Sequence, residues 1–220
     1  MDEIYLISHT QNKAVKNLKV CEIEFLKFSV DLNKFEALVI TSKNSIKALK
    51  FNNIKKANLK VFSIGDGSTK EALEYGFSDI YTAKNSHGNE FANEIASFLK
   101  DKKTLFLKAE KTVSDVGEIL SKNGAILTKI TAYKNNFLNL DKSLKPPLGS
   151  ILIFSSPSNV EGFIKNFGKL DENYKVVAIG NATAKLLSSH KNLIISQKQS
   201  IDECLKLAKN FNNSLNTTIF

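Results

Sequence analysis

The amino-acid sequence repeats itself. Leu38–Ser42 (LVITS) resembles Leu152–Ser156 (LIFSS), and Val61–Gly65 (VFSIG) resembles Val176–Gly180 (VVAIG). Both pairs have almost the same separation, and a period of roughly 110 residues is far longer than that of a solenoid repeat. The repeat therefore predicts two related domains produced by duplication.

Short apolar runs alternate with segments of helical periodicity, as at 91–99 and 160–167. This alternation is typical of the α/β class, in which helices join the strands of a parallel sheet. Each half is expected to begin with strand, helix and strand. The expected strands are Ile4–Ser8, Ile23–Val30, Ala37–Thr41, Val61–Ile64, Asp79–Thr82, Thr104–Leu107, Ile126–Tyr133, Ser150–Phe154, Val176–Ile179 and Leu193–Ser196.

The duplication suggests that the two halves exchange strands. Residues 34–130 hold enough expected strands to close a doubly wound sheet alone. Residues 1–24 would then join residues 140–220 in a discontinuous first domain, with 25–33 and 131–139 as two connecting strands. The polar tail after Asn210 is expected to fray.

The net charge of +9 comes from an excess of lysine, since all 31 basic residues are lysines. Arginine is the usual residue for reading bases and for gripping phosphate with two hydrogen bonds, so its absence argues against sequence-specific nucleic-acid binding. The lysines suit an anionic ligand, although a coding bias toward lysine, asparagine and isoleucine would also explain them.

Several features indicate a cytoplasmic protein without a membrane span. No apolar run is long enough to cross a bilayer, and the acidic, strand-like start Met1–Tyr5 is unlike a signal peptide. Cys21 and Cys204 are too few for a disulfide framework and are expected to be small core residues.

Hydroxyl-rich turns are the most informative local feature. Thr41–Ser45 and Ser155–Ser158 each follow an apolar strand and precede a helix, and Ser156 before Pro157 is typical of an N-cap. Helix capping alone would explain such turns. Ligands of doubly wound sheets, however, bind at the carboxyl ends of the strands, where helix amides attract anions.

The glycine turns Gly65–Thr69 and Gly180–Thr183 form a second equivalent pair. The first is not a dinucleotide fingerprint, because Lys70 stands where the third glycine belongs. His9, His87 and His190 are scattered, which predicts neither a metal site nor a serine–histidine–acid triad. No paired carboxylates stand out either.

Taken together, these motifs resemble the uroporphyrinogen-III synthase family over residues 1–209. The resemblance depends on their order and spacing along the chain. The matching segments are Thr41-Ser42, Gly65 with Ser68 and Gly76, Leu105–Lys108, Gly124-Ala125, Thr131–Lys134, Ser155–Ser158 and Gly180–Thr183.

The resemblance implies two flavodoxin-like domains joined by a two-stranded β ladder, with an open cleft between them. It implies a cofactor-free lyase of haem biosynthesis that takes hydroxymethylbilane as substrate. We expect the protein to be a monomer. Loss of the substrate's hydroxyl as water gives an electrophilic azafulvene, and the enzyme then closes the ring with inversion of the terminal pyrrole. The substrate's eight side-chain carboxylates would be held by amides, hydroxyls and lysines.

By family position, residues on both halves are expected to line the cleft. Tyr133 is the expected catalytic residue, with its ring emerging at the cleft mouth. The expected substrate-binding residues are Thr41, Ser42, Lys43, Ser68, Lys108, Ser155, Ser156 and Thr183. The chain departs from the family pattern in having Ser8-His9 where Thr-Arg is common, Lys108-Ala109 where Arg-Gly is common, and Ser68 where threonine is usual.

Other functions remain possible from the sequence. A two-lobed intracellular binding module for a small polyanion would use the same architecture. A pair of receiver domains would need an acidic cluster, which Thr41-Ser42 and Gly65-Asp66 do not supply. A methyltransferase would need an acidic residue at the end of its second strand, and none can be placed there.

Overall fold

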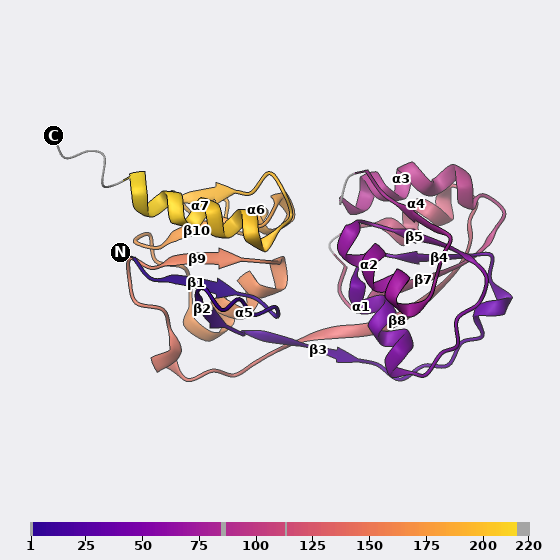
Figure 1. The fold of residues 1–220 in the computed structure, drawn as a ribbon, viewed down its shortest axis with the longest axis horizontal. Coiled ribbons are helices and arrows are strands. Elements are labelled where there is room, and N and C mark those ends of the chain that lie inside the picture. The colour runs from indigo at the N-terminus through magenta and orange to yellow at the C-terminus, as the bar shows by residue number, and fades with distance from the viewer. Residues whose placement is uncertain (1, 85–86, 113, 215–220) are drawn as a thin grey trace. The chain divides into compact units, whose positions relative to one another are not determined.

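The computed structural model describes residues 2–84, 87–112 and 114–214. It divides the chain into two compact units, unit 1 (Met1–Glu22 with Asn136–Phe220) and unit 2 (Ile23–Asn135) (Figure 1). The chain passes between the units within β3 (Cys21–Phe25) and β8 (Ile126–Phe137), which are hydrogen-bonded neighbours. Both units have the predicted α/β architecture.

Unit 1 is built on a five-stranded sheet whose neighbouring strands all run parallel. The order β11-β10-β9-β1-β2 places the first strand of the chain between β2 and β9. By position this is the 2-1-3-4-5 order of flavodoxin-like folds. The strands are β1 (Ile4–Ile7), β2 (Lys16–Leu18), β9 (Ile151–Phe154), β10 (Lys175–Ala178) and β11 (Leu193–Ile195).

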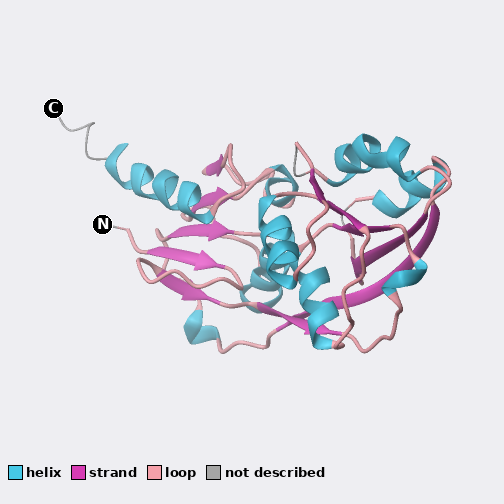
Figure 2. Cartoon of the chain, turned by 45° about the vertical axis from the view of Figure 1, so that its right-hand side comes forward, coloured by secondary structure: helices cyan, strands magenta, loops and turns pink. Residues whose placement is uncertain are grey.

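Helices cover both faces of this sheet (Figure 2). On one face lie α5 (Pro157–Phe167) and α6 (Asn181–Lys185), with Phe163 against Phe154. On the other face lies α7 (Ile201–Ser214), with Cys204 in the core. Because both faces are covered, the central strands β1, β9 and β10 are mainly apolar. The helix α7 extends into the predicted tail, and residues 215–220 lie outside the described part of the chain.

The helix predicted between the first two strands of the chain is absent from unit 1. A short strand, β2, occupies this stretch instead. The Asn17 side chain fixes the loop before it, because its Oδ1 accepts from the Asn12 amide at 2.8 Å and its Nδ2 donates to the Asn12 and Val15 carbonyls. Asparagine that bonds nearby backbone in this way competes with helix formation.

Unit 2 contains a six-stranded sheet of order β3-β8-β7-β4-β5-β6, whose last five strands run parallel. These five have the flavodoxin-like order when counted from β7. The remaining strands are β4 (Ala37–Ile40), β5 (Lys60–Ser63), β6 (Ile80–Thr82) and β7 (Lys103–Ala109). One face is covered by α1 (Lys43–Phe51) and α2 (Asp66–Tyr75), and the other by α3 (Gly88–Leu99) and α4 (Val116–Lys122).

The strand predicted over Ile23–Val30 ends early, at Phe25. Beyond Phe25, the backbone forms hydrogen bonds with the side chain of Asn52, at the end of α1. Its Nδ2 donates to the Leu26 carbonyl at 2.9 Å and its Oδ1 accepts from the Phe28 amide at 3.2 Å. The first predicted connecting strand, 25–33, is therefore mostly loop, followed by the 3₁₀ helix Leu32–Lys34. The second belongs to β8, which runs unbroken to Phe137.

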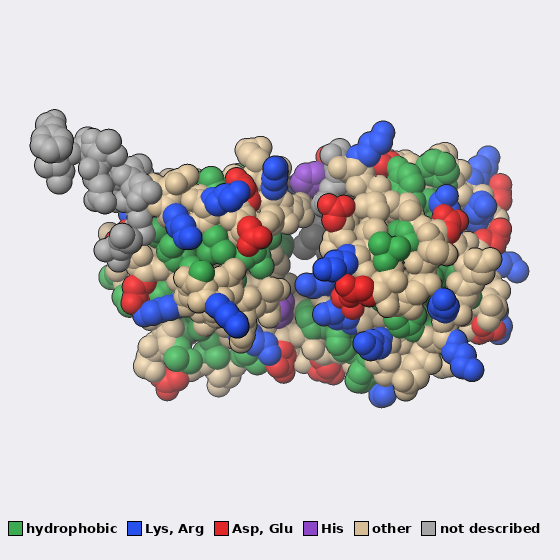
Figure 3. Space-filling view, viewed as in Figure 1, with side chains coloured by type: hydrophobic (Ala, Val, Ile, Leu, Met, Phe, Trp, Pro, Cys, Tyr) green, Lys and Arg blue, Asp and Glu red, His purple; other side chains and the backbone are tan. Residues whose placement is uncertain are grey.

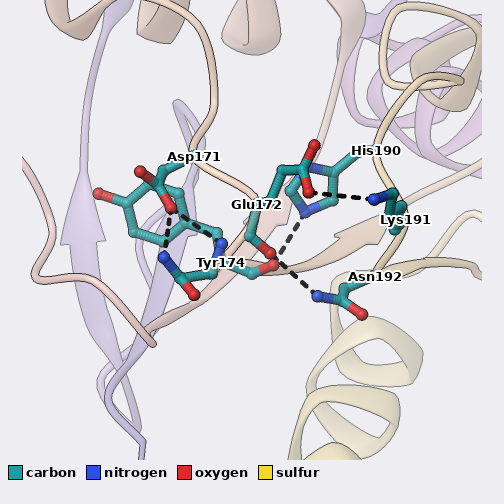
Figure 4. Close-up of polar contacts among 7 residues, drawn as sticks. Asp171, Glu172, Tyr174, His190, Lys191 and Asn192 are labelled. Atoms are coloured by element: carbon teal, nitrogen blue, oxygen red, sulfur yellow. Dashed lines mark hydrogen bonds and ion pairs between the residues drawn. The ribbon is translucent and has the colours of Figure 1, made fainter.

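The amino-terminal edge of the unit 1 sheet is closed by polar contacts between two loops (Figure 4). The His190 ring bonds the Tyr174 carbonyl through Nε2 at 2.8 Å, and Asn192 donates to the Glu172 carbonyl at 3.0 Å. Lys191 adds an ion pair with the Glu172 carboxylate at 3.3 Å. His190 thus has a structural role at the edge opposite the hydroxyl-rich turns.

Candidate functional site

Each sheet has one point where its strand order reverses, and ligands of doubly wound sheets bind beside the carboxyl ends of the strands at such a point. In unit 1 this point lies between β1 and β9, whose last residues, Ile7 and Phe154, are paired. In unit 2 it lies between β7 and β4, where Leu107 pairs with Ile40. The predicted turns Ser155–Ser158 and Thr41–Ser45 begin next to these points. The two places are named here the unit 1 and unit 2 half-sites.

The unit 1 half-site is organised around two adjacent serines. Ser156 is the N-cap of α5, with Pro157 in the first turn, as predicted. The Ser155 hydroxyl donates to the Ser8 hydroxyl at 2.8 Å, and Ser8 in turn accepts from the Thr10 amide at 3.0 Å. The turn after β9 is therefore fastened to the turn after β1. Ser155 and Ser156 are both half-buried, so a ligand can reach them.

A fully buried asparagine lies beneath these serines. Asn159 Nδ2 donates to Ser155 Oγ at 3.0 Å and to Ser156 Oγ at 2.8 Å. Its Oδ1 accepts from the thiol of Cys21 at 3.2 Å. Burial raises the pKa of the Cys21 thiol to about 11, so the thiol keeps its proton. Sequence reasoning missed Asn159; the available signal was a polar residue three positions after an N-cap, on the buried side of the helix.

The unit 2 half-site has the equivalent turn. Ser42 is the N-cap of α1, and its Oγ accepts from the Asn44 amide at 3.2 Å. Thr41 and Ser42 are half-buried, and Lys43 is exposed in the first turn. Ser45, which corresponds to Asn159, is fully buried and donates to the Leu107 carbonyl at 2.8 Å. The turn after β4 is thus fastened to the neighbouring strand β7.

Tyr133 does not emerge at a surface, contrary to the prediction. Its side chain is 5 % exposed and lies in the core beside α1. The cause is a β-bulge: Lys108 pairs with Thr131 but Ala109 pairs with Tyr133, so alternation breaks and Ala132 is buried too. Burial raises the pKa of the Tyr133 phenol, while hydrogen bonds to Ser42 and Ser45 act in the opposite direction. The phenol is therefore buried beside Ser42 and Ser45 and is not exposed at the half-site.

Three other predicted residues lie less openly than expected. Lys108 directs its Nζ to the Ala109 carbonyl at 2.9 Å and is half-buried. The side chains of Ser68 and Thr183 are 7 % and 2 % exposed. Since both follow a glycine N-cap and face inward, they support the glycine turns and do not present a hydroxyl to solvent, which corrects the expectation for these two side chains.

Other reactive groups are few in the described residues. No cluster of three or more histidine, cysteine or acidic side chains could hold a metal ion there. Cys21 and Cys204 are both buried and free, as predicted. On the face shown in Figure 3, lysines are interspersed with acidic side chains and form no single basic stripe. No helix in the described part has the length and apolarity to span a bilayer.

Comparison with known proteins gives a consistent result. The family model described as uroporphyrinogen-III synthase HemD matches residues 19–206. Uroporphyrinogen-III synthetase from Helicobacter pylori is similar, with 28 % identity, a TM-score of 0.79, and coverage of 96 % of this chain and 100 % of that chain. The Thermus thermophilus enzyme, a mutant form, matches in fold at 13 % identity and TM-score 0.61, over 98 % and 99 % of the two chains.

Comparison with curated protein sequences gives no match. The family model nevertheless spans most of the chain, and it agrees with the order of motifs and with the sheet topology of both units. The chain therefore belongs to the uroporphyrinogen-III synthase family, the enzymes of haem biosynthesis that cyclise hydroxymethylbilane.

Proposed function

We propose that this chain binds hydroxymethylbilane at both half-sites while it catalyses the family reaction. The supporting observation is that the half-site occurs twice, once at the switch point of each sheet. In both, a capping serine opens a helix, α1 or α5, of nine or eleven residues. The first amides of such a helix carry partial positive charge and attract carboxylates. A substrate that carries carboxylates along its length can use both.

The chemistry demands positioning more than strong acids or bases. The substrate hydroxyl departs readily, and the isomer formed depends on which carbon of the terminal pyrrole meets the azafulvene. Holding two reacting groups in place can lower a barrier by roughly 7–11 kcal/mol. Each hydrogen bond to a charged group contributes about 1.5–3 kcal/mol. A few hydroxyls, amides and lysines are therefore sufficient to hold the folded chain.

We assign direct contact to the accessible groups. These are the side chains of Thr41, Ser42, Lys43, Ser155 and Ser156, together with the amides that follow each serine cap. Tyr133 contributes through Ser42, because its phenol bonds that hydroxyl from the core. Lys108, Ser68 and Thr183 contribute by holding the turns. We also propose that residues 1–24 with 140–220 and residues 34–130 are the two domains, each with its own half-site.

We further propose that the enzyme works as a monomer in the cytoplasm and binds neither nucleic acid nor membrane. Two buried free thiols suit a reducing compartment. The mixture of lysine with acidic side chains in Figure 3 is unlike a nucleic-acid groove. Light scattering of the purified protein tests its oligomeric state, and titration with fluorescent DNA and RNA oligonucleotides tests nucleic-acid binding. A dimer at assay concentration or tight oligonucleotide binding would refute the respective point.

The central test supplies hydroxymethylbilane to the purified chain and separates the uroporphyrin isomers after oxidation. Type III should dominate, since the uncatalysed reaction gives type I. Ser42→Ala and Ser156→Ala should each raise KM, and Ser121→Ala is the matched control. Ser121 bonds the Gly117 carbonyl at 2.8 Å within α4 and belongs to neither half-site. Dominant type I at high enzyme concentration would reject the proposal in favour of a polyanion-binding module.

A further inference from the structure

We propose that Asn159 is a positioning residue, whose side-chain amide leaves the Ser156 hydroxyl able only to donate, so that its proton is offered to a substrate carboxylate. The inference rests on the proposed function of the unit 1 half-site and adds the group that sets its hydrogen-bonding direction. Asn159 is fully buried and is not expected to touch substrate.

The direction follows from counting the bonds of one hydroxyl. A serine Oγ can accept two hydrogen bonds and donate one. Ser156 Oγ accepts from the Asn159 backbone amide at 3.3 Å and from Asn159 Nδ2 at 2.8 Å. Both acceptor positions are thereby filled from one residue. The proton of this half-buried hydroxyl is what remains for a ligand, and a carboxylate is the ligand that can only accept.

Three neighbours fix the orientation of the amide. The Cys21 thiol donates to Oδ1 at 3.2 Å. Nδ2 then has two hydrogens, and it uses them on Ser156 Oγ and on Ser155 Oγ at 3.0 Å. The Ser155 hydroxyl donates its hydrogen bond to Ser8 Oγ. Every polar group of the Asn159 side chain is therefore used, and rotation by half a turn would lose both hydrogen bonds that Nδ2 donates to the serines.

Unit 2 has a different arrangement at the equivalent position. Ser45 stands three positions after the Ser42 cap, and its hydroxyl donates to the Leu107 carbonyl at 2.8 Å. Ser42 Oγ accepts from the Asn44 backbone amide at 3.2 Å, and position 45 offers it no side-chain amide. The two capping serines correspond in sequence, yet the unit 1 serine alone accepts a second hydrogen bond from an asparagine three positions later.

The test compares Asn159→Asp with Asn166→Asp. Both asparagines are buried on α5, and Asn166 likewise donates twice, to the Leu138 and Gly162 carbonyls at 2.9 and 2.8 Å, but it lies at the far end of the helix. An aspartate at 159 accepts from both serines and draws the Ser156 proton inward. We expect KM for hydroxymethylbilane to rise at least tenfold, with kcat within threefold of wild type. Asn166→Asp should lower Tm and leave KM unchanged.

Two further variants make every outcome decisive. In Ser156→Ala the proton is already gone, so adding Asn159→Asp should raise KM no further. Asn159→Ser installs the residue found at Ser45 and should also raise KM, without adding a buried charge. If either single Asn159 variant keeps the wild-type KM while Tm falls as in Asn166→Asp, Asn159 only stabilises the start of α5 and the inference is overturned. If the wild-type protein does not form mainly the type III isomer, the proposed function itself is rejected.

Discussion

Replacing Tyr133 by phenylalanine tests whether the buried phenol acts through Ser42. The ring would stay in its place in the core, since only one oxygen is removed from a side chain that is 5 % exposed. Ser42 and Ser45 would each lose their hydrogen bond with the phenol. The Ser42 hydroxyl would then be held less firmly at the half-site.

The structure sets the size of the effect. Loss of two hydrogen bonds, each worth about 0.5–1.5 kcal/mol net, should lower the free energy of unfolding by about 1–3 kcal/mol. Loss of orientation at Ser42 should cost about 1 kcal/mol of transition-state stabilisation, or roughly fivefold in kcat. Initial rates of hydroxymethylbilane consumption give kcat and KM, and urea unfolding gives the stability of the same preparation.

The decisive measurement is a double-mutant cycle. If Tyr133 acts through Ser42, Tyr133→Phe in the Ser42→Ala background should change kcat by less than twofold, because its intermediary is already gone. If the two substitutions lower kcat additively, this reasoning is refuted and Tyr133 acts on the substrate independently of Ser42. Tyr174→Phe is the matched control: it removes the hydroxyl of a buried tyrosine that donates to the Pro146 carbonyl at 2.6 Å. It should lose stability and keep kcat.

Three further results are expected. Asn52→Ala should lower the free energy of unfolding by about 1–3 kcal/mol with kcat unchanged, because the Leu26 carbonyl and Phe28 amide lose their partner; an equal loss of kcat would contradict a structural role. The free energy of unfolding should fall between pH 9 and about 11, because the Cys21 thiol ionises only in the unfolded chain there, and Cys21→Ala should reduce the slope in urea titrations. KM should rise with ionic strength, since lysines attract a polyanion, and a salt-independent KM would argue against that attraction.

The sequence was sufficient where short-range patterns decide the structure. Apolar runs predicted the strands of both sheets except β2, and Ser156 before Pro157 predicted a helix cap that the structure confirms. The resemblance built on these motifs is confirmed by the family match. Capping and strand alternation depend on neighbours within a few residues, so a single sequence carries them.

Tertiary contacts account for what the sequence did not predict. The burial of Tyr133 follows from a bulge opposite Lys108 and Ala109. The residue pattern of β8 alone does not predict this shift in register. Asn159 acquires its role from Cys21, which lies 138 positions earlier in the chain. The three-residue strand β2 is mostly polar and forms because β1 offers it a parallel edge.

The strand orders also bear on how the polypeptide is made. When the parallel strands of each sheet are numbered in the 2-1-3-4-5 order, the chain first supplies positions 1 and 2 of unit 1. It then supplies positions 3, 4, 5, 1 and 2 of unit 2, and finally positions 3, 4 and 5 of unit 1. Two tandem copies of one domain have therefore exchanged strands. Unit 2 is contiguous and can fold as soon as β8 leaves the ribosome, whereas β1 waits for β9. Until then the apolar strand β1 lacks one of its two neighbours, which makes the nascent chain a candidate for chaperone binding. Because each half-site joins a turn from one copy to a strand from the other, neither copy could have had either half-site in this form alone.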